Sequence, residues 1–266
     1  MDVTRHPVET ESRVPTGSTN AYLVGSDPAM LVDPAGRTDE LDRAVAERGV
    51  EHVLLTHTHA DHVGAVDVYA TETGATVWAR RGHVDRFQDA TGRTPDRTLS
   101  PEASITLGDD TVRVLEAAGH APDHVALEAG RNGPICCGDC AVRDGSVAVA
   151  APDGDMRAYV ETLRRLWTID PPTLYPGHGP AVETPRETLE RLLEHRARRE
   201  RRVLAAVDSG SRTLEEILET AYEKDVSGVR DLAEATVVCH LEKLDVEGRL
   251  EWDGTQARPS RPSETS

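Results

Sequence analysis

The chain concentrates three histidines and an aspartate within six residues, as His57, His59, Asp61 and His62. The apolar run at 53–56 directly before them predicts a short buried strand, so the cluster should begin at the carboxyl end of that strand. His57 and His59 stand two apart in an extended segment and should project to the same side. Neutral imidazole and carboxylate are ligands that Zn²⁺ takes, and a catalytic zinc site keeps a position open for water. The hexapeptide therefore predicts part of a catalytic metal site.

Three more residues of ligand type follow later predicted strands, each in a loop that contains glycine. They are His120 after Gly119, Asp139 after Gly138, and His178 between Gly177 and Gly179. Glycine at such positions lets the backbone approach a site closely and adopt turn geometries. With the first cluster, these residues supply five histidines and two aspartates, which is enough for two metal ions.

Other residues that could do chemistry receive weaker predictions. Cys137 and Cys140 have the CxxC spacing, but a structural zinc site needs a second pair, and the chain offers only the distant Cys239. Together with Cys136 they are predicted to be small buried residues at the end of a strand. His124 is predicted to be a hydrogen-bonded structural residue, and Tyr175 to pack in the core.

The elements that must position these residues alternate between strand and helix over the first two thirds of the chain. Hydrophobic periodicity predicts strands at 21–24, 30–33, 53–56, 76–79, 111–117, 125–129, 134–137 and 173–175, and helices at 38–48, 61–73 and 156–167. The polar stretch 88–101 predicts a surface loop. After residue 185, helices at 187–207, 213–222 and 231–247 and a strand at 249–252 resemble a winged-helix module. The last residues, 255–266, lack apolar periodicity and are predicted to be disordered.

The composition limits the kind of protein that this can be. A chain of 266 residues suffices for one large domain with a small added module. Acids outnumber bases by 47 to 30, which gives a net charge of −17, and lysine occurs only at Lys224 and Lys243. Hydrated carboxylates keep molecules apart where salt screens charge, so we expect a halophilic protein; an ordinary acidic protein encoded with a GC-rich bias is the alternative. Neither a membrane span nor a secretory signal is evident, which predicts a cytoplasmic protein.

Together these motifs resemble the metallo-β-lactamase superfamily and, within it, the glyoxalase II-like and lactamase-beta-like hydrolases. The resemblance runs from about Gly17 to Trp252, with the opening strands matched at 19–24 and 31–33. It implies an α/β fold, the four-layer αββα sandwich, followed by a small C-terminal winged-helix-like helical module. The division is a hydrolase domain at 1–184, a helical linker and winged-helix-like module at 185–254, and a disordered tail at 255–266.

The resemblance also implies roles for the residues. One zinc would be held by His57, His59 and His120 and the second by Asp61, His62 and His178, with Asp139 bridging both. Two such ions, about 3.5–4 Å apart, would share a hydroxide that attacks an ester, thioester or phosphodiester. Asp61 and Asp139 are the candidate catalytic residues, because they offset the cationic charge and hold the nucleophile. Asp33 matches a family position just outside the ligands, where it would either orient an imidazole or cap a turn. Zinc is the first choice, and iron or manganese would suit the same ligands.

Three functions compete. A glyoxalase II-type thioesterase would carry a basic C-terminal pattern that is not evident here. A single-stranded RNA endoribonuclease is closer in its motifs, because residues 175–180, 195–196 and 199–200 resemble the lactamase-beta-like endoribonuclease branch, but a net charge of −17 opposes RNA binding. A metal-sensing winged-helix regulator is the non-enzymatic alternative, although helix 231–247 is acidic where a major-groove helix needs bases. The expected partners are a small ester or thioester or an RNA substrate, without membrane or sequence-specific DNA, and a homodimer is left open.

Overall fold

The apolar runs of the first half of the chain form a six-stranded sheet in the computed structural model, which describes residues 1–11, 16–222 and 226–260. In spatial order the strands are β1 (Val3–Glu9), β2 (Ser18–Val24), β3 (Ala29–Val32), β4 (Val50–Leu54), β5 (Thr76–Arg80) and β6 (Arg97–Leu99). Strands β1 to β3 pair antiparallel, and β3 to β6 run parallel. Because β3 and β4 are parallel neighbours, Asp33 and the cluster at 57–62 leave the sheet at the same edge.

A second, five-stranded sheet supplies the other predicted site residues. In spatial order its strands are β11 (Leu174–Pro176), β10 (Ile135–Gly138), β9 (Val125–Ala129), β8 (Asp110–Glu116) and β7 (Ser104–Leu107). Strands β10 and β11 are parallel, so Asp139 and His178 follow adjacent strand ends. Backbone hydrogen bonds join the two sheets at this edge, from Val125 N to Thr56 O at 2.8 Å and from Asn20 N to Gly177 O at 2.7 Å.

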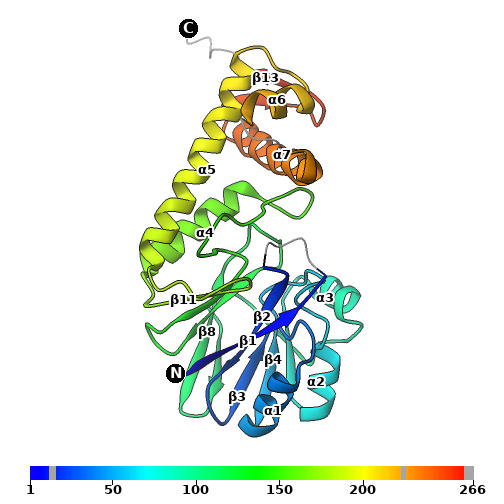
Figure 1. Ribbon diagram of the computed structural model, residues 1–266, viewed down its shortest axis with the longest axis vertical. Coiled ribbons are helices and arrows are strands. Elements are labelled where there is room, and N and C mark those ends of the chain that lie inside the picture. Colours follow the sequence, from blue (N-terminus) through cyan, green and yellow to red (C-terminus); the bar gives the residue numbers. More distant parts are fainter. Residues whose placement is uncertain (12–15, 223–225, 261–266) are drawn as a thin grey trace.

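Four layers stack around three apolar cores (Figure 1). Helices α1 (Asp39–Arg48), α2 (Val66–Thr73) and α3 (Val84–Thr91) cover the outer face of the first sheet. A second core fills the space between the sheets, and a third lies between the second sheet and helices α4 (Met156–Ile169) and α5 (Pro185–Asp208). The predicted αββα order of layers is therefore present. None of the helices within the described residues is long and apolar enough to cross a membrane.

The C-terminal unit has a small core of its own. It consists of the second half of α5, α6 (Leu214–Ala221), the short 3₁₀ helix η1 (Ser227–Val229), α7 (Arg230–Val246) and the hairpin β12 (Leu250–Trp252) with β13 (Ala257–Pro259). Thr213 and Glu216 form a capping box at the start of α6, which fixes that helix boundary. Strand β13 corrects the prediction of a disordered tail: Ala257 is fully buried and pairs with Trp252. The end of that predicted tail, 261–266, lies outside the described residues.

The helix predicted over 61–73 is shorter than expected, because α2 begins only at Val66. Residues 60–65 form turns, and His62 N donates to His59 O at 3.0 Å. A side chain at Gly64 would come within 2.4 Å of Ala35 O, so the backbone packs too closely here for a helix with side chains on all faces. This turn lets consecutive residues of the cluster point at one place.

The stretch 88–101, predicted to be a loop, contains the end of α3 and all of β6. Phe87 and Leu99 are almost fully buried and anchor the two elements, and Asp96 Oδ2 accepts a hydrogen bond from Val77 N at 2.8 Å. Single buried residues in a polar stretch give no periodic signal, which is why the prediction was wrong. Strands β1 and β7 were also not predicted, whereas the other predicted strands and helices are confirmed with shifts of a few residues at their ends.

Candidate metal centre

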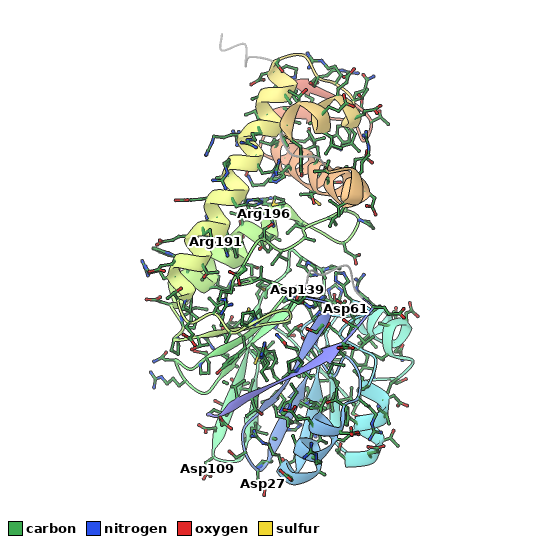
Figure 2. All side chains as sticks on the ribbon, viewed as in Figure 1. Asp27, Asp61, Asp109, Asp139, Arg191 and Arg196 are labelled. Atoms are coloured by element: carbon green, nitrogen blue, oxygen red, sulfur yellow. The ribbon has the colours of Figure 1, made fainter. Side chains whose placement is uncertain are left out.

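All seven residues predicted to hold metals converge at one end of the sandwich. Figure 2 places Asp61 and Asp139 at the end that faces the C-terminal helices, whereas Asp27 and Asp109 lie at the opposite end. The contributing loops follow β4, β8, β10 and β11, all of which end at this edge. Three groups of possible ligands are close enough to share an ion: His57, His59 and His120; His57, His62 and Asp139; and Asp61, His62 and His178.

The first group is a triangle of imidazoles. His59 Nδ1 lies 3.0 Å from His57 Nε2 and 2.9 Å from His120 Nε2. The rings are nearly perpendicular, with 80–81° between the plane of His59 and those of its neighbours. Nitrogens from two loops, the one after β4 and the one after β8, thus face one common point, which is the arrangement of a three-histidine metal site.

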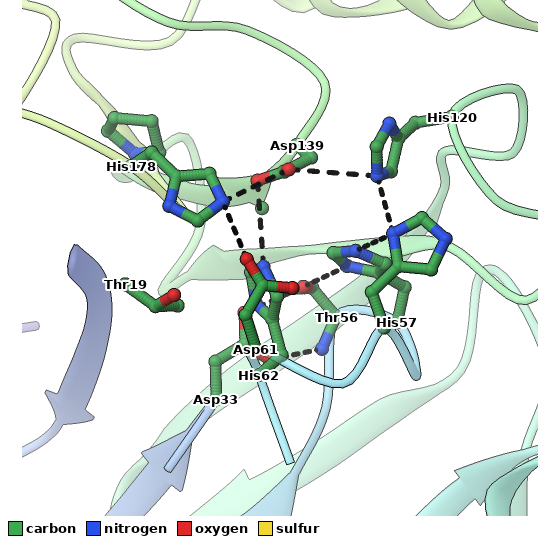
Figure 3. A network of polar contacts seen from close by, with 12 residues as sticks. Thr19, Asp33, Thr56, His57, Asp61, His62, His120, Asp139 and His178 are labelled. Carbon is green, nitrogen blue, oxygen red and sulfur yellow. Dashed lines mark hydrogen bonds and ion pairs between the residues drawn. The ribbon is translucent and has the colours of Figure 1, made fainter. Parts of the chain in front are cut away.

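The group of Asp61, His62 and His178 stands on the other side of Asp139 from His120 (Figure 3). His178 Nε2 lies 3.5 Å from Asp61 Oδ2 and 3.3 Å from Asp139 Oδ2. The same Asp139 oxygen is 3.6 Å from His120 Nε2, while its partner oxygen is 3.8 Å from His62 Nε2. Asp139 is therefore in reach of both groups, and one carboxylate can serve two ions.

The hydrogen bonds on the far side of each ring fix which nitrogen faces the centre. Outward nitrogens contact the following groups: His62 Nδ1 with Asp33 Oδ2 (3.0 Å), His120 Nδ1 with Ala148 O (2.7 Å), His178 Nδ1 with Ser18 O (2.9 Å), His59 Nε2 with Asp153 Oδ2 (3.3 Å) and His57 Nδ1 with Thr56 Oγ1 (3.1 Å). Carbonyl and carboxylate oxygens only accept, and the Thr56 hydroxyl already donates to Asp33 at 2.7 Å. Each outward nitrogen therefore carries a proton, so a ring in its neutral form turns a lone pair inward.

Several of the inward atoms are left without hydrogen bonds. Among the described residues, the buried polar atoms that lack a hydrogen-bond partner include His62 Nε2, His178 Nε2 and Asp139 Oδ1. Buried polar groups are normally paired, so each such atom needs an explanation. Lone pairs that face each other at about 3 Å in the histidine triangle also repel unless a cation or a proton lies between them. The residues fit divalent metal ions, which would satisfy both conditions.

Burial and neighbouring charges set the protonation of the site. Burial lowers the pKa of His57 well below its usual value, and nearby imidazoles add to the shift. Burial would raise the pKa of Asp139, but the close approach of His178 and the charges of the surrounding imidazoles hold it well below its usual range. Burial would lower the pKa of His62, yet the charge and hydrogen bond of Asp33 raise it to about 9. A metal ion at His62 would therefore displace a proton from Nε2.

Asp33 and His124 support the site from outside, as predicted for residues near it. Asp33 is fully buried and accepts from Thr56 N at 2.6 Å as well as from His62. His124 Nε2 accepts from Asp139 N at 3.0 Å, so its ring holds the backbone of Asp139 rather than facing the centre. Tyr175 packs against Tyr22 with 5.5 Å between ring centroids, which confirms its core position.

The four cysteines are all free and buried, which confirms the prediction for Cys136, Cys137 and Cys140. Burial raises the pKa of Cys136, Cys137 and Cys140, and for Cys137 it reaches about 12. Thiols at such pKa values stay protonated and unreactive at neutral pH. Within the described residues, none of the groups that could hold a metal contains a cysteine.

Two residues beside the centre, Asp153 and Arg86, were not predicted from the sequence. Asp153 lies in the loop before α4 and contacts His59, and Arg86 on α3 contacts Asp153 through two nitrogens. Neither residue stands in a motif of ligand type or at the end of a predicted strand. The only available signal was an aspartate in a loop that returns toward the sheet edge, which is too common to single out.

Comparison with known proteins shows the family. The sequence model of the metallo-β-lactamase superfamily matches residues 14–178, and the chain belongs to this superfamily. A beta-lactamase-like protein 2 homolog from Drosophila melanogaster is 28% identical over 87% of this chain and 84% of its own length. The probable metallo-hydrolase YqjP of Bacillus subtilis is 27% identical, with 91% of this chain and 94% of that protein covered. An atrochrysone carboxyl ACP thioesterase from Aspergillus fumigatus is 26% identical over 80% of this chain and 71% of that protein.

Solved structures agree with the fold. The metallo-beta-lactamase family protein TTHA1429 from Thermus thermophilus superposes with a TM-score of 0.76 at 23% identity, covering 97% of this chain and 98% of that one. TTHA1623, solved in a di-iron-bound form, gives a TM-score of 0.55 at 27% identity over 68% of this chain and 96% of that chain. The superfamily, its metallo-hydrolase relatives and the cluster of ligand residues make the chain a metal-dependent hydrolase.

Proposed function

We propose that the chain is a dinuclear zinc-dependent hydrolase that cleaves the thioester or ester of a small molecule. The observation that carries the proposal is the convergence of five inward imidazole nitrogens and two carboxylates at one end of the sandwich. The thioesterase relative supports the substrate class, because it covers most of this chain. The finer assignment to a thioester follows from that likeness, and a panel of substrates tests it.

The ligand set divides into two halves. His57, His59 and His120 would hold one ion, and Asp61, His62 and His178 the other, with Asp139 between them. When bound, such ions lower the pKa of a water molecule toward 7 and polarise the substrate oxygen that becomes negative. Zinc suits the nitrogen-rich set, and the di-iron form of TTHA1623 makes iron the alternative to test.

The two aspartates differ in exposure, which suggests different tasks. The Asp139 side chain is 11% exposed and holds both halves of the site together. The Asp61 side chain is 20% exposed and lies beside His178. Asp61 is placed to accept a hydrogen bond from the attacking water, while Asp139 and the buried imidazoles of His57 and His62 keep the ligands in fixed positions.

Nucleic-acid functions receive less support from the C-terminal unit. Helices α5 to α7 and the hairpin β12–β13 have the element order of a winged helix, and we retain that assignment for 185–254 as a proposal. Helix α7, however, buries seven residues, among them Cys239 and His240, against the rest of the chain. Its exposed side chains include Asp231, Glu242 and Asp245, whereas a helix that enters a major groove needs bases. The net charge of −17 further disfavours RNA as the substrate.

Metal content and a substrate panel test the proposal together. Purified protein should bind two zinc ions per chain, and one or none despite added zinc would overturn the dinuclear site. The panel contains an acyl-pantetheine thioester, a simple ester, a lactone, single-stranded RNA and a phosphodiester, each assayed at 0.1 and 2 M NaCl. We expect the thioester to give the highest kcat/KM. Cleavage of RNA with no thioester turnover would move the function to the endoribonuclease branch, and specific DNA binding without hydrolysis would favour the regulator.

The shared carboxylate is tested by Asp139→Asn. An amide bears no charge and offers only one oxygen, so we expect a loss of more than about 100-fold in kcat and weaker binding of both ions. Asp67→Asn is the matched control, because the Asp67 side chain is exposed and pairs with Arg93 away from the metal centre. Unchanged turnover and two bound ions in Asp139→Asn would contradict the bridging role.

A further inference from the structure

The segment 140–155 lies between the candidate metal centre and the C-terminal helices, and we call it the strap. It starts directly after Asp139 and ends at Asp155, whose side chain caps the N-terminus of α4. Asp155 N also donates to Gly119 O at 2.9 Å, beside His120. The strap has no helix or strand of its own, so its shape depends on contacts with both neighbours.

Toward the metal centre, the strap contacts two of the five histidines. Ala148 O accepts the hydrogen bond from His120 Nδ1 at 2.7 Å. The carboxylate of Asp153 accepts from His59 Nε2 at 3.3 Å. Both rings belong to the histidine triangle, and in both cases the strap fixes the outward nitrogen. The direction in which the inward nitrogens of His59 and His120 point therefore depends on the position of the strap.

Asp153 is itself held in place by Arg86 on α3. Two guanidinium nitrogens of Arg86 contact the two oxygens of Asp153, while its Nε donates to Thr58 Oγ1 at 2.9 Å and lies 3.3 Å from Asp123 Oδ1. Its charge is thus matched by two carboxylates, which makes Arg86 a poor anchor for an anionic substrate. Arg86 instead holds the Asp153 carboxylate in an orientation that faces His59. The His59 side chain is 31% exposed, which makes it the most accessible of the five histidines.

On its other side, the strap is held by helices α5 and α7. Arg191 donates to the carbonyls of residues 142, 143 and 145, and the buried Arg196 donates to Val147 O, one residue before Ala148. Figure 2 shows both arginines on the part of α5 near the sandwich. From α7, Ala235 O accepts from Ala151 N at 3.2 Å and Cys239 Sγ lies 3.2 Å from Gly154 O. Contacts from the C-terminal helices thus flank both residues that the strap presents to the centre.

We propose that Asp153 is a positioning residue for His59, and that the C-terminal helices, acting through the strap, set the orientation of His59 and His120. The C-terminal unit is then part of the architecture of the metal centre. The inference rests on the proposed metal site, but the orientation of His59 can be measured without metal. Groups that orient metal ligands are usually worth 10–100-fold in metal affinity.

The first experiment compares Asp153→Ala with Asp67→Asn. Asp67 also pairs with an arginine, Arg93, but on the outer helices, so its variant controls for the loss of an acidic ion pair. Histidine side-chain NMR of the metal-free protein should show His59 with its proton on Nε2, and Asp153→Ala should shift that ring toward the other tautomer. Zinc titration against a chromophoric chelator should show one of the two ions bound about 10–100-fold more weakly. An unchanged tautomer together with unchanged affinities would overturn the role of Asp153.

The second experiment tests the helices through Arg196→Met, with Arg186→Met as control. Both are on α5, but Arg186 contacts Asp170, Glu190 and Trp167 rather than the strap. Methionine keeps an unbranched apolar stem, and it loses both the bond to Val147 O and the guanidinium that lies over the Tyr159 ring. We expect Arg196→Met to weaken the same zinc ion as Asp153→Ala, although Arg196 contacts no ligand residue in the described hydrogen bonds. Normal zinc affinity in a folded Arg196→Met protein would overturn the part assigned to the helices.

If Arg196→Met does not fold, Cys239→Ala and Cys239→Ser serve in its place. Serine keeps a donor for Gly154 O and alanine does not, so alanine should weaken zinc binding more than serine. Equal zinc affinities in the two variants would count against the helices. A wild-type protein that binds fewer than two ions would instead overturn the proposed function, and the NMR measurement on metal-free protein would still decide the role of Asp153.

Discussion

Asp33 Oδ2 accepts a hydrogen bond from His62 Nδ1 at 3.0 Å, and both side chains are almost completely excluded from solvent. The same carboxylate accepts from Thr56 N at 2.6 Å and from Thr56 Oγ1 at 2.7 Å. One aspartate at the end of β3 thereby fixes both the first turn of the loop after β4 and the ring of His62. The inward direction of His62 Nε2 is a consequence of this arrangement.

Replacement of Asp33 by asparagine should weaken metal binding at His62. The amide can still accept from Thr56 N, but its NH₂ group then donates to His62 Nδ1 and moves the ring proton to Nε2. A protonated Nε2 cannot bind a metal ion, so we expect one zinc ion to bind roughly 10–100-fold more weakly. Zinc titration with a competing chelator measures the change. Asp39→Asn, on the exposed first turn of α1, is the control, and equal affinity in the two variants would contradict this role.

Gly177 is required by the close approach of its loop to Asp139. A Cβ atom at this position would lie 2.3 Å from Asp139 Oδ1 and 2.8 Å from His62 Cε1. We therefore expect Gly177→Ala to displace the shared carboxylate, to weaken both ions and to lower stability by about 1–3 kcal/mol. Gly228→Ala should do neither, because no atom of the described residues lies within 4 Å of a Cβ there. Two tightly bound zinc ions in Gly177→Ala would refute the expectation, with metal analysis after dialysis as the measurement.

The parts of the site that could be predicted share one physical property. His57, His120, Asp139 and His178 all follow a short apolar run, and the ends of strands in one sandwich meet at one edge. Strand signals are local, so the sequence was enough to place these residues together. Glycines next to them added a second local signal, which the steric environment of Gly177 now explains.

The parts that could not be predicted depend on contacts between distant segments. Asp153 contacts His59, which lies 94 residues earlier in the sequence, and Arg196 contacts Val147, which lies 49 residues earlier. The strap has neither helical nor strand periodicity, so the sequence of residues 140–155 does not indicate which segments it contacts. Strand β13 was missed for the same reason: three residues with one buried Ala257 pair with β12 only because the C-terminal core is already present.

His240 should make stability fall as the pH decreases. The ring is fully buried, and neither of its nitrogens has a hydrogen-bond partner among the described residues. Burial, aided by the charges of Arg196 and Arg199, lowers its pKa from 6.5 to about 3. The unfolded chain therefore binds a proton at His240 below pH 6.5, whereas the folded chain binds it only near pH 3. The free energy of unfolding is at its full value above pH 6.5 and decreases as the pH falls from 6.5 to about 3.

Replacement of His240 by leucine isolates that effect. At pH 5.5 the histidine should cost the wild type about 1.4 kcal/mol relative to pH 7.5, and the variant should not show this part of the loss. Urea unfolding of metal-free protein at the two pH values measures the difference, because chelation removes the separate pH dependence of metal binding. Parallel losses in wild type and His240→Leu would show that this ring does not titrate as expected.

Salt should stabilise the protein, because its net charge is −17 and repulsion between carboxylates opposes the folded state. Raising NaCl from 0.1 to 1 M shortens the Debye length from about 10 to 3 Å, so we expect the Tm of metal-free protein to rise.

Asp27 and Asp109 are exposed at the end of the sandwich opposite the metal centre (Figure 2). The double variant Asp27→Asn with Asp109→Asn should gain up to roughly 0.5 kcal/mol at low salt and show a smaller rise with NaCl. Calorimetry across the salt series tests both statements. A Tm that is flat or falls with salt would contradict the expectation of a salt-adapted protein, whereas an equal rise in the double variant would place the repulsion elsewhere on the surface.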